Sequence, residues 1–311
     1  MAPIGVSRGH EYRTGVLRSQ KGAGSGPEFG CVKPGTDGAA QGFAARLWRE
    51  AECKRSWVCL GLDLDLQRLP EGLPRSVDGA REFLVEIVDA CADVVLAFKP
   101  NVAFYLALGP DGLQLLRDVR DVIGERALLI ADNKVGDVAD STERYASFLF
   151  DYLEADATTF NPWGGRDATQ PLIERPERGA FAWLRSSNPG ADELQGLQTV
   201  DGEPVYLRLA RRLAEWNELE NLGVVVGATR PDDVATVRDV TPGMPILAPG
   251  VGAQGGALEA TVQAGYGPEP AGVVVNAGRS ALWAGSGPDY ARAVRSKVQA
   301  MRSAIEAARL R

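Results

Sequence analysis

Residues 127–137 have the sequence ALLIADNKVGD, an apolar run that passes directly into alternating acidic and basic residues. A short, continuous apolar run of this kind is typical of a parallel strand that is buried on both faces. Polar residues that follow such a strand lie at its carboxyl end, which is where α/β proteins bind their ligands. The stretch therefore predicts a buried strand followed by a functional segment.

Seven further apolar runs of this type alternate with helical stretches that are rich in Ala, Leu, Arg and Glu. The eight runs cover residues 57–63, 93–99, 127–132, 156–161, 179–187, 222–228, 245–250 and 271–277. Eight strands, each followed by a helix, predict a single α/β domain with the (β/α)8 TIM barrel fold. A doubly wound open sheet is the alternative, but no GxGxxG motif opens the first helix.

The barrel domain is expected to span residues 40–311. Residues 1–39 contain few apolar residues and many glycines, which predicts a disordered extension; a weak organelle-targeting peptide or a vector-derived leader is the alternative. A first helix is expected near 40–54, and a last one near 288–309 with Pro288 in its first turn. The last helix has an apolar stripe formed by Tyr290, Val294, Val298, Met301 and Ile305.

Composition excludes several classes of function. The only histidine is His10, in the Gly-rich extension, so catalytic triads, Cys–His pairs and histidine-ligated zinc are not expected. The net charge of −7 argues against a nucleic-acid partner. No apolar run approaches the roughly 20 residues that span a bilayer, and the start of the chain lacks the apolar core of a signal peptide. We therefore expect a cytoplasmic protein with no membrane partner.

Two Gly-rich segments follow the seventh and eighth strands. Residues 249–256 have the sequence PGVGAQGG, and Gly278 precedes Arg279 at the end of the last strand. Glycines allow backbone N–H groups to approach a phosphate closely, and barrels frequently bind phosphate at this pair of loops. Arg279 would add a permanently charged, bidentate donor. These segments predict a phosphate-binding site.

The charged residues after the third strand indicate the chemistry. In extended backbone Asp132 and Lys134 point to the same side, and Lys99 comes from the end of the neighbouring strand. Such an array of opposite charges can keep a lysine protonated in a desolvated site, where it can stabilise a carbanion and then protonate it. A purely structural network of ion pairs at the barrel rim is the alternative.

The motifs together resemble the orotidine 5′-phosphate decarboxylase family, in its larger, bacterial-type branch. The resemblance covers roughly residues 55–285. It rests on KPNVAFY at 99–105, DNKVGD at 132–137, SNPGA at 187–191, VVVGAT at 224–229, PGVGAQGG at 249–256 and NAGRS at 276–280. The DxKxxD pattern by itself is shared with sugar-phosphate relatives, whereas the ordered set is specific.

The resemblance implies a carboxy-lyase that converts orotidine 5′-monophosphate to UMP and CO2, in pyrimidine biosynthesis, without a metal or cofactor. Lys99, Asp132, Lys134 and Asp137 would form a catalytic tetrad, with Lys134 protonating C6 of the pyrimidine. Asp137 would reach into the neighbouring subunit of a homodimer. Ser141 occupies a position where the family usually has an interface threonine.

The resemblance also implies the residues that bind the substrate. Asp63, together with the first lysine of the tetrad, would hold the ribose hydroxyls, and Ser187 would bind the pyrimidine edge. Gln254 would bridge base and phosphate, while Gly278 and Arg279 would hold the phosphate.

Three other functions remain open from the sequence. The first is a metal-dependent relative acting on a phosphorylated keto sugar, such as a ketogulonate-phosphate decarboxylase or a hexulose-phosphate synthase. The second is a ribulose-phosphate epimerase, whose metal site needs histidines that this sequence lacks. The third is a barrel that binds a phosphorylated ligand without catalysis.

Overall fold

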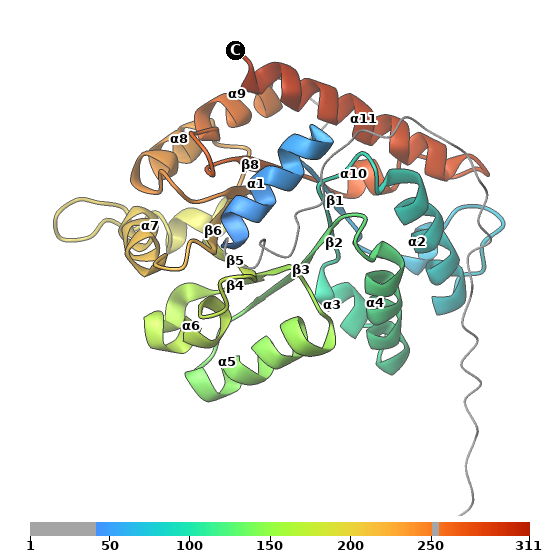
Figure 1. Cartoon of the computed structure of the whole chain (residues 1–311), viewed down its shortest axis with the longest axis horizontal. Coiled ribbons are helices and arrows are strands. Elements are labelled where there is room, and N and C mark those ends of the chain that lie inside the picture. Colours follow the sequence, from blue (N-terminus) through green and yellow to red (C-terminus); the bar gives the residue numbers. More distant parts are fainter. Residues whose placement is uncertain (1–41, 251–254) are drawn as a thin grey trace, which may run out of the picture. The chain divides into compact units, whose positions relative to one another are not determined.

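Eight parallel strands form one closed barrel within the residues that the computed structural model describes, 42–250 and 255–311 (Figure 1). The strands follow each other around the barrel in sequence order, and β8 pairs with β1. They are β1 (Val58–Gly61), β2 (Ala97–Lys99), β3 (Leu128–Val135), β4 (Ala157–Phe160), β5 (Gly179–Arg185), β6 (Leu222–Val226), β7 (Ile246–Pro249) and β8 (Val273–Ala277). The predicted (β/α)8 barrel is confirmed.

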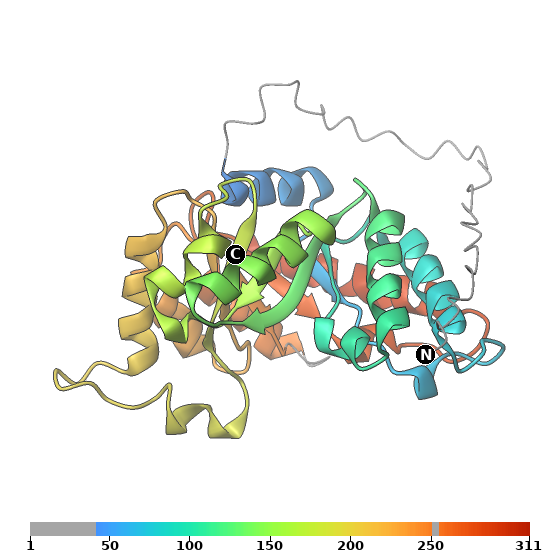
Figure 2. The same cartoon turned by 90° about the horizontal axis from the view of Figure 1, so that it is seen from below.

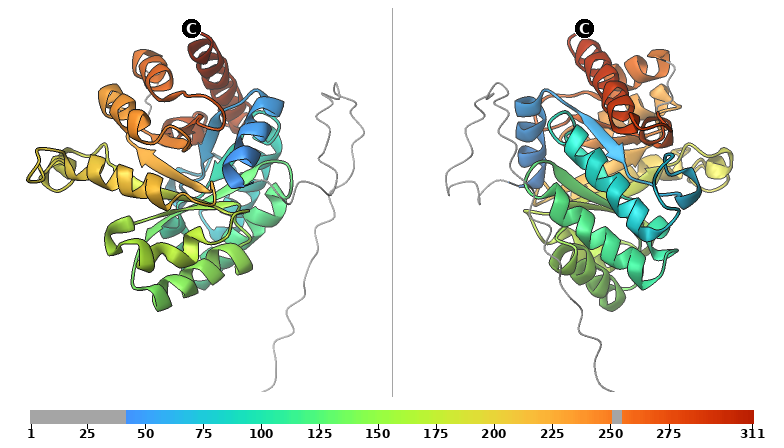
Figure 3. Two further views of the ribbon diagram at one scale, coloured as in Figure 1. Left: turned by 60° about the vertical axis from the view of Figure 1, so that its left-hand side comes forward. Right: turned by 90° about the vertical axis from the view of Figure 1, so that its right-hand side faces the viewer.

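Helices follow the strands and surround the barrel (Figures 1 and 3). The α-helices are α1 (Phe43–Lys54), α2 (Val77–Cys91), α3 (Val102–Leu106), α4 (Pro110–Ile123), α5 (Ala139–Ala146), α6 (Arg166–Ile173), α7 (Val205–Trp216), α8 (Pro231–Val240), α9 (Gly255–Gly265), α10 (Arg279–Leu282) and α11 (Tyr290–Arg309). The 3₁₀-helical turns are η2 (Leu66–Arg68), η4 (Pro162–Gly164) and η5 (Pro189–Glu193), and η3 (Ser147–Tyr152) is a π-helical turn. The segment between β5 and α7, which contains η5, projects away from the barrel (Figure 2).

Aromatic side chains fill the amino end of the barrel. Phe43 of α1 packs edge-on against Phe181, with the ring centroids 6.1 Å apart, and occupies the space that a Cβ on Gly179 would need. Trp57, directly before β1, lies so close to Gly272 that a Cβ there would be 2.0 Å from the ring. Large side chains thus close this end, and the polar cluster described below lies at the opposite, carboxyl end of the strands.

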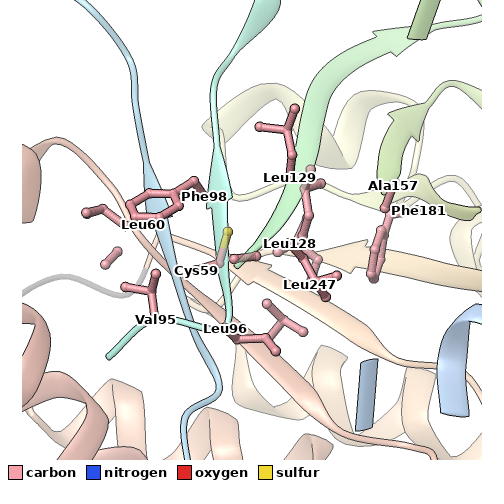
Figure 4. Packing of buried hydrophobic residues seen from close by; sticks show 14 of the residues in the cluster. Cys59, Leu60, Val95, Leu96, Phe98, Leu128, Leu129, Ala157, Phe181 and Leu247 are labelled. Carbon is pink, nitrogen blue, oxygen red and sulfur yellow. The ribbon is translucent and has the colours of Figure 1, made fainter. Parts of the chain in front are cut away.

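The strands are embedded in a packed apolar core of buried side chains (Figure 4). Leu60, Phe98, Leu129, Phe181 and Leu247 come from five different strands and are each at most 1% exposed. Such close-packed interiors resist deformation. The core therefore supports the polar residues at the ends of β2 and β3 on a rigid platform.

The two terminal helices lie near their predicted positions, but both begin later than expected. The α11 stripe predicted from the sequence is buried throughout. Pro288, expected in the first turn of that helix, instead precedes it, since α11 begins at Tyr290. The backbone N–H of Tyr290 bonds to the carbonyl of Gly287, so Pro288 lies in a turn, at the second position that proline favours. The expected extension, residues 1–39, lies outside the described residues and stays a prediction.

Among the described helices, none combines the length and apolar character that a membrane span requires. The strand bounds differ from the predicted ones chiefly at β2, which begins at Ala97 and not at residue 93, and at β3. The apolar run was expected to end at Asp132, but the strand continues through Lys134 to Val135. Polar residues extend the strand because they bond to β4 across a bulge, which is described below.

Candidate active site

Two lysines and one aspartate meet at the carboxyl ends of β2 and β3. The Asp132 carboxylate accepts a hydrogen bond from Lys99 Nζ at 2.6 Å through Oδ2, and one from Lys134 Nζ through Oδ1. Lys99 and Asp132 are 4% and 6% exposed, whereas Lys134 is partly exposed. The structure thus joins three of the four residues of the predicted tetrad into one charged cluster.

The surroundings favour the charged forms of the buried pair. Burial by itself would lower the pKa of Lys99, but the negative charges of Asp132 and Asp63 outweigh it, so the pKa is raised. Burial would raise the pKa of Asp132, but Lys99 and Lys134 hold it well below its usual range. Both partners therefore stay ionised at least between about pH 4 and pH 10, the ordinary pKa values of Asp and Lys.

A bulge in β3 presents Lys134. Between the paired positions Ala131–Thr158 and Val135–Phe160, β3 advances by four residues while β4 advances by two. Within the bulge Lys134 has a φ of +49°, in the left-handed region. The expectation of extended backbone is therefore wrong at this residue, although its side chain still reaches Asp132. Left-handed backbone is unfavourable for a residue with a side chain and is common at functional sites.

Gly136 is required by the approach of the next loop. A Cβ at this position would lie 2.3 Å from the carbonyl oxygen of Asn161, which follows β4. The Asn161 N–H in turn donates to the carbonyl of Val135 at 2.8 Å. The glycine of the DNKVGD motif thus allows β4 to close the bulge, a role that the motif spacing did not reveal.

Asp63, at the end of β1, lies beside the cluster. Burial raises its pKa, partly offset by the positive charge of Lys99 and by a backbone hydrogen bond from Asn101. Its Oδ1 is buried and has no hydrogen-bond partner among the described residues. An unpartnered buried carboxylate oxygen is costly unless a ligand or water donates to it. Asp63 therefore provides a free acceptor next to the two lysines.

Ser187 follows β5 and faces the ends of β6 and β7. A Cβ on Gly227 would lie 2.8 Å from Cβ of Ser187, and one on Gly250 would lie 3.6 Å from its Oγ. Two residues earlier, buried Arg185 donates to Asp233 at 2.8 Å and to Asp192 at 2.5 Å. Through Arg185, these ion pairs connect η5, in the segment between β5 and α7, to the start of α8. No motif in the sequence indicates this role of Arg185.

Arg279 stands at the start of α10, directly after Gly278 at the end of β8. Its side chain is exposed, and within residues 42–250 and 255–311 it forms no ion pair. An exposed guanidinium without an internal partner is available for an anionic ligand. Gln254 and most of its loop lie outside the described residues.

Asp137 does not join the cluster. Its side chain is exposed, and among the described residues its one hydrogen-bond donor is the N–H of Val138, at 2.7 Å from Oδ1. Ser141 is half-buried on α5, and the following residue, Thr142, is buried and donates to the carbonyl of Asp137 at 2.9 Å. Thr142 thus stabilises the start of α5. The interface role expected of Ser141 stays a prediction.

The fold and the charged cluster define a (β/α)8-barrel enzyme whose lysines and aspartates lie at the carboxyl ends of β1, β2 and β3. Comparison with known proteins identifies its relatives. The chain belongs to the Orotidine 5′-phosphate decarboxylase / HUMPS family, which matches residues 56–293. The resemblance predicted from the sequence motifs is therefore confirmed.

Individual relatives agree with this assignment. An orotidine 5′-phosphate decarboxylase of Thermomicrobium roseum is 43% identical over 266 residues, covering 85% of this chain and 95% of that protein. The enzyme of the same name from Azoarcus sp. is 43% identical over 264 residues, covering 84% and 96%. The structure of Leishmania donovani OMP decarboxylase is 30% identical, with a TM-score of 0.72, and covers 85% and 99%. The chain thus spans nearly the full length of these relatives.

Proposed function

We propose that this chain decarboxylates orotidine 5′-monophosphate to UMP and CO2 in pyrimidine biosynthesis, using only its own side chains. The observation that carries the proposal is the Lys99–Asp132–Lys134 cluster, in a barrel of this family. Its buried carboxylate is compensated by two ammonium groups, which leaves a protonated lysine at the partly exposed end of the cluster. This combination suits a reaction that generates and then protonates a carbanion.

Lys134 is the proposed proton donor. The bond between C6 and the carboxylate breaks, CO2 leaves, and the electron pair remains on C6 in the plane of the ring. Because this pair cannot delocalise into the π system, a nearby ammonium group supplies its stabilisation. A proton then passes from Lys134 Nζ to C6, and a proton taken up from the solvent restores the ammonium group, so that the overall reaction consumes one proton. Asp132 keeps the ammonium in place throughout.

The remaining predicted residues are proposed to hold the rest of the nucleotide. Asp63, with its unpartnered Oδ1, and Lys99 are suited to ribose hydroxyls. Ser187 is proposed to bind the pyrimidine edge, and Arg279 with Gly278 the phosphate. Gln254 keeps its predicted role between base and phosphate. Binding of the phosphate, remote from C6, would help to position the base and lower the barrier.

A homodimer is part of the proposal. Asp137 is exposed and unpaired with any described cation, and the adjacent Val138 is 67% exposed. Trp163 is 75% exposed, and a Cβ on the next residue, Gly164, would lie 3.7 Å from the carbonyl oxygen of Asp137. Exposed apolar side chains beside an unused carboxylate support a partner surface at this end of the barrel. The cytoplasmic location expected from the sequence stays a prediction.

The test of the proposed activity is a spectrophotometric assay with purified protein and orotidine 5′-monophosphate, followed at the ultraviolet band that is lost on decarboxylation. The expected result is turnover to UMP that persists after treatment with EDTA. Turnover only on a phosphorylated keto sugar, abolished by EDTA and restored by magnesium, would assign the metal-dependent relatives instead. No turnover on either substrate would favour a ligand-binding barrel.

Asp137 can be tested by mixing two inactive variants, Lys134→Ala and Asp137→Asn. If Asp137 serves the neighbouring subunit, each mixed dimer contains one intact site, and random mixing restores about a quarter of the wild-type activity. If Asp137 serves its own subunit, mixing restores none. Sedimentation that shows an active monomer would overturn the dimer.

A further inference from the structure

Thr159, on β4, is a buried residue whose side chain contacts the charged cluster and which neither the motifs nor the proposed mechanism includes. It is 1% exposed. Its hydroxyl donates to Asp132 Oδ1 at 2.8 Å. The same oxygen accepts the backbone N–H groups of Asn133 at 3.0 Å and of Lys134 at 3.1 Å.

These three hydrogen bonds use the full capacity of the hydroxyl, which is one donor and two acceptor positions. They also lie where the β3 bulge interrupts the regular pairing with β4. A bulge leaves backbone N–H groups without ladder partners, and here the side chain of Thr159 accepts two of them. The hydroxyl thus replaces the missing ladder and binds the carboxylate at the same time.

Lys134 depends on this support because its backbone is unfavourable. With a φ of +49° it persists only where the surroundings hold it in place. Its N–H is held by Thr159, and its Nζ is held by Asp132, which Thr159 also holds. One side chain therefore fixes both ends of the lysine that the proposed mechanism uses.

We propose that Thr159 is the positioning residue of the site: its hydroxyl holds the left-handed backbone of Lys134 and orients the Asp132 carboxylate, so that Nζ faces the reacting carbon. The proposal rests on the function proposed above. A displacement of about 1 Å at a reacting group can reduce the rate by about 100-fold. Loss of the hydroxyl is therefore expected to lower kcat more than it weakens nucleotide binding.

The neighbouring residue provides a matched control. Thr158 is equally buried, on the same strand, but its hydroxyl donates to the carbonyl of Ala131 at 2.9 Å, with the carbonyl oxygen of Thr159 at 3.3 Å. It forms no hydrogen bond with a side chain of the cluster. Thr159→Val and Thr158→Val each remove one buried hydroxyl and keep the shape of the side chain. Thr159→Ser keeps the hydroxyl and removes only a methyl group.

The experiment measures kcat, the affinity for UMP and amide hydrogen exchange in wild type and the three variants. Thr159→Val is expected to lower kcat by about 10- to 100-fold while the Kd for UMP changes by less than about threefold. Thr159→Ser is expected to restore most of kcat, and Thr158→Val to behave like wild type. In Thr159→Val the amides of Asn133 and Lys134 should exchange roughly three- to tenfold faster, as expected for one lost hydrogen bond.

Three results would overturn the proposal: wild-type kcat in Thr159→Val, an equal loss of kcat in Thr158→Val, or loss of UMP binding that parallels the loss of kcat. If Thr159→Val does not fold, Thr159→Ala removes the same hydroxyl without a branched replacement. If the wild-type chain does not decarboxylate orotidine 5′-monophosphate, the proposed function fails. Hydrogen exchange then still decides whether Thr159 holds the Lys134 backbone, since unchanged exchange would refute it.

Discussion

Replacement of Asp132 by Asn should destabilise the fold strongly, and the effect should depend on pH. The substitution keeps the shape of the side chain but removes the charge that compensates Lys99, which is 4% exposed. Breaking a buried ion pair by removing one partner costs about 3–5 kcal/mol. Because Asp63 still contributes negative charge to the surroundings of Lys99, we expect the lower end, about 3 kcal/mol.

The pH dependence follows from the lysine that remains. In wild type the raised pKa of Lys99 contributes stability that is present below the unfolded-state pKa and is lost as the pH rises through the folded-state pKa. In the variant the remaining burial lowers the pKa of Lys99, so the variant gains stability as the pH rises towards about 10.4, the unfolded-state value. The difference in the free energy of unfolding between wild type and Asp132→Asn should therefore shrink between pH 7 and pH 10.

The assay is differential scanning calorimetry at equal protein concentration. At pH 7 a loss of about 3 kcal/mol corresponds to a Tm lowered by roughly 6–12 °C for a domain of this size. Asp78→Asn is the control, because it breaks an exposed pair with Arg81 and should cost at most about 1 kcal/mol. An Asp132→Asn variant as stable as wild type at pH 7, or a difference that grows towards pH 10, would refute this account of the cluster.

Three further predictions concern the loops and the chemistry. Gly136→Ala should lower kcat and should lower the free energy of unfolding by about 1–3 kcal/mol, because its Cβ would lie 2.3 Å from the Asn161 carbonyl oxygen. Gly243→Ala is the control, since the space around Gly243 is open. Calorimetry that finds the two variants equally stable would contradict the steric account. Arg279→Ala should weaken UMP binding by about 10- to 150-fold, which corresponds to the loss of one charge-assisted hydrogen bond. Arg292→Ala, on the exposed face of α11, should leave the affinity unchanged. If calorimetric titration finds the same affinity for UMP in Arg279→Ala as in wild type, the phosphate binds elsewhere. EDTA should leave kcat unchanged in the ultraviolet assay, and a loss that magnesium reverses would contradict a metal-free reaction.

The arrangement of strands and helices could be predicted from the sequence because each element carries its own pattern. Continuous apolar runs gave the eight strands, and the apolar stripe from Tyr290 to Ile305 gave the last helix. The meeting of Asp132 with Lys99 could be predicted as well, since adjacent parallel strands end at the same edge of the barrel.

The finer geometry of the site could not be predicted, because it depends on contacts between distant segments. Alternation predicted that Asp132 and Lys134 share a side, yet they meet through a bulge whose shape depends on Thr159, on the next strand. Nothing in the residues around Thr159 distinguishes it from Thr158, which serves only the backbone. Arg185 likewise depends on Asp233, which lies 48 residues further along the chain.

The most direct test of the central claim, that Lys134 protonates C6, is the kinetics of Lys134→Ala with orotidine 5′-monophosphate, together with its affinity for UMP. Lys134 is proposed to supply both electrostatic stabilisation and the proton, so kcat should fall by at least about 10⁴-fold. UMP should still bind with nearly wild-type affinity, because the carbon that the lysine is proposed to protonate carries no charge in the product. A variant that retains kcat near the wild-type value would contradict the claim.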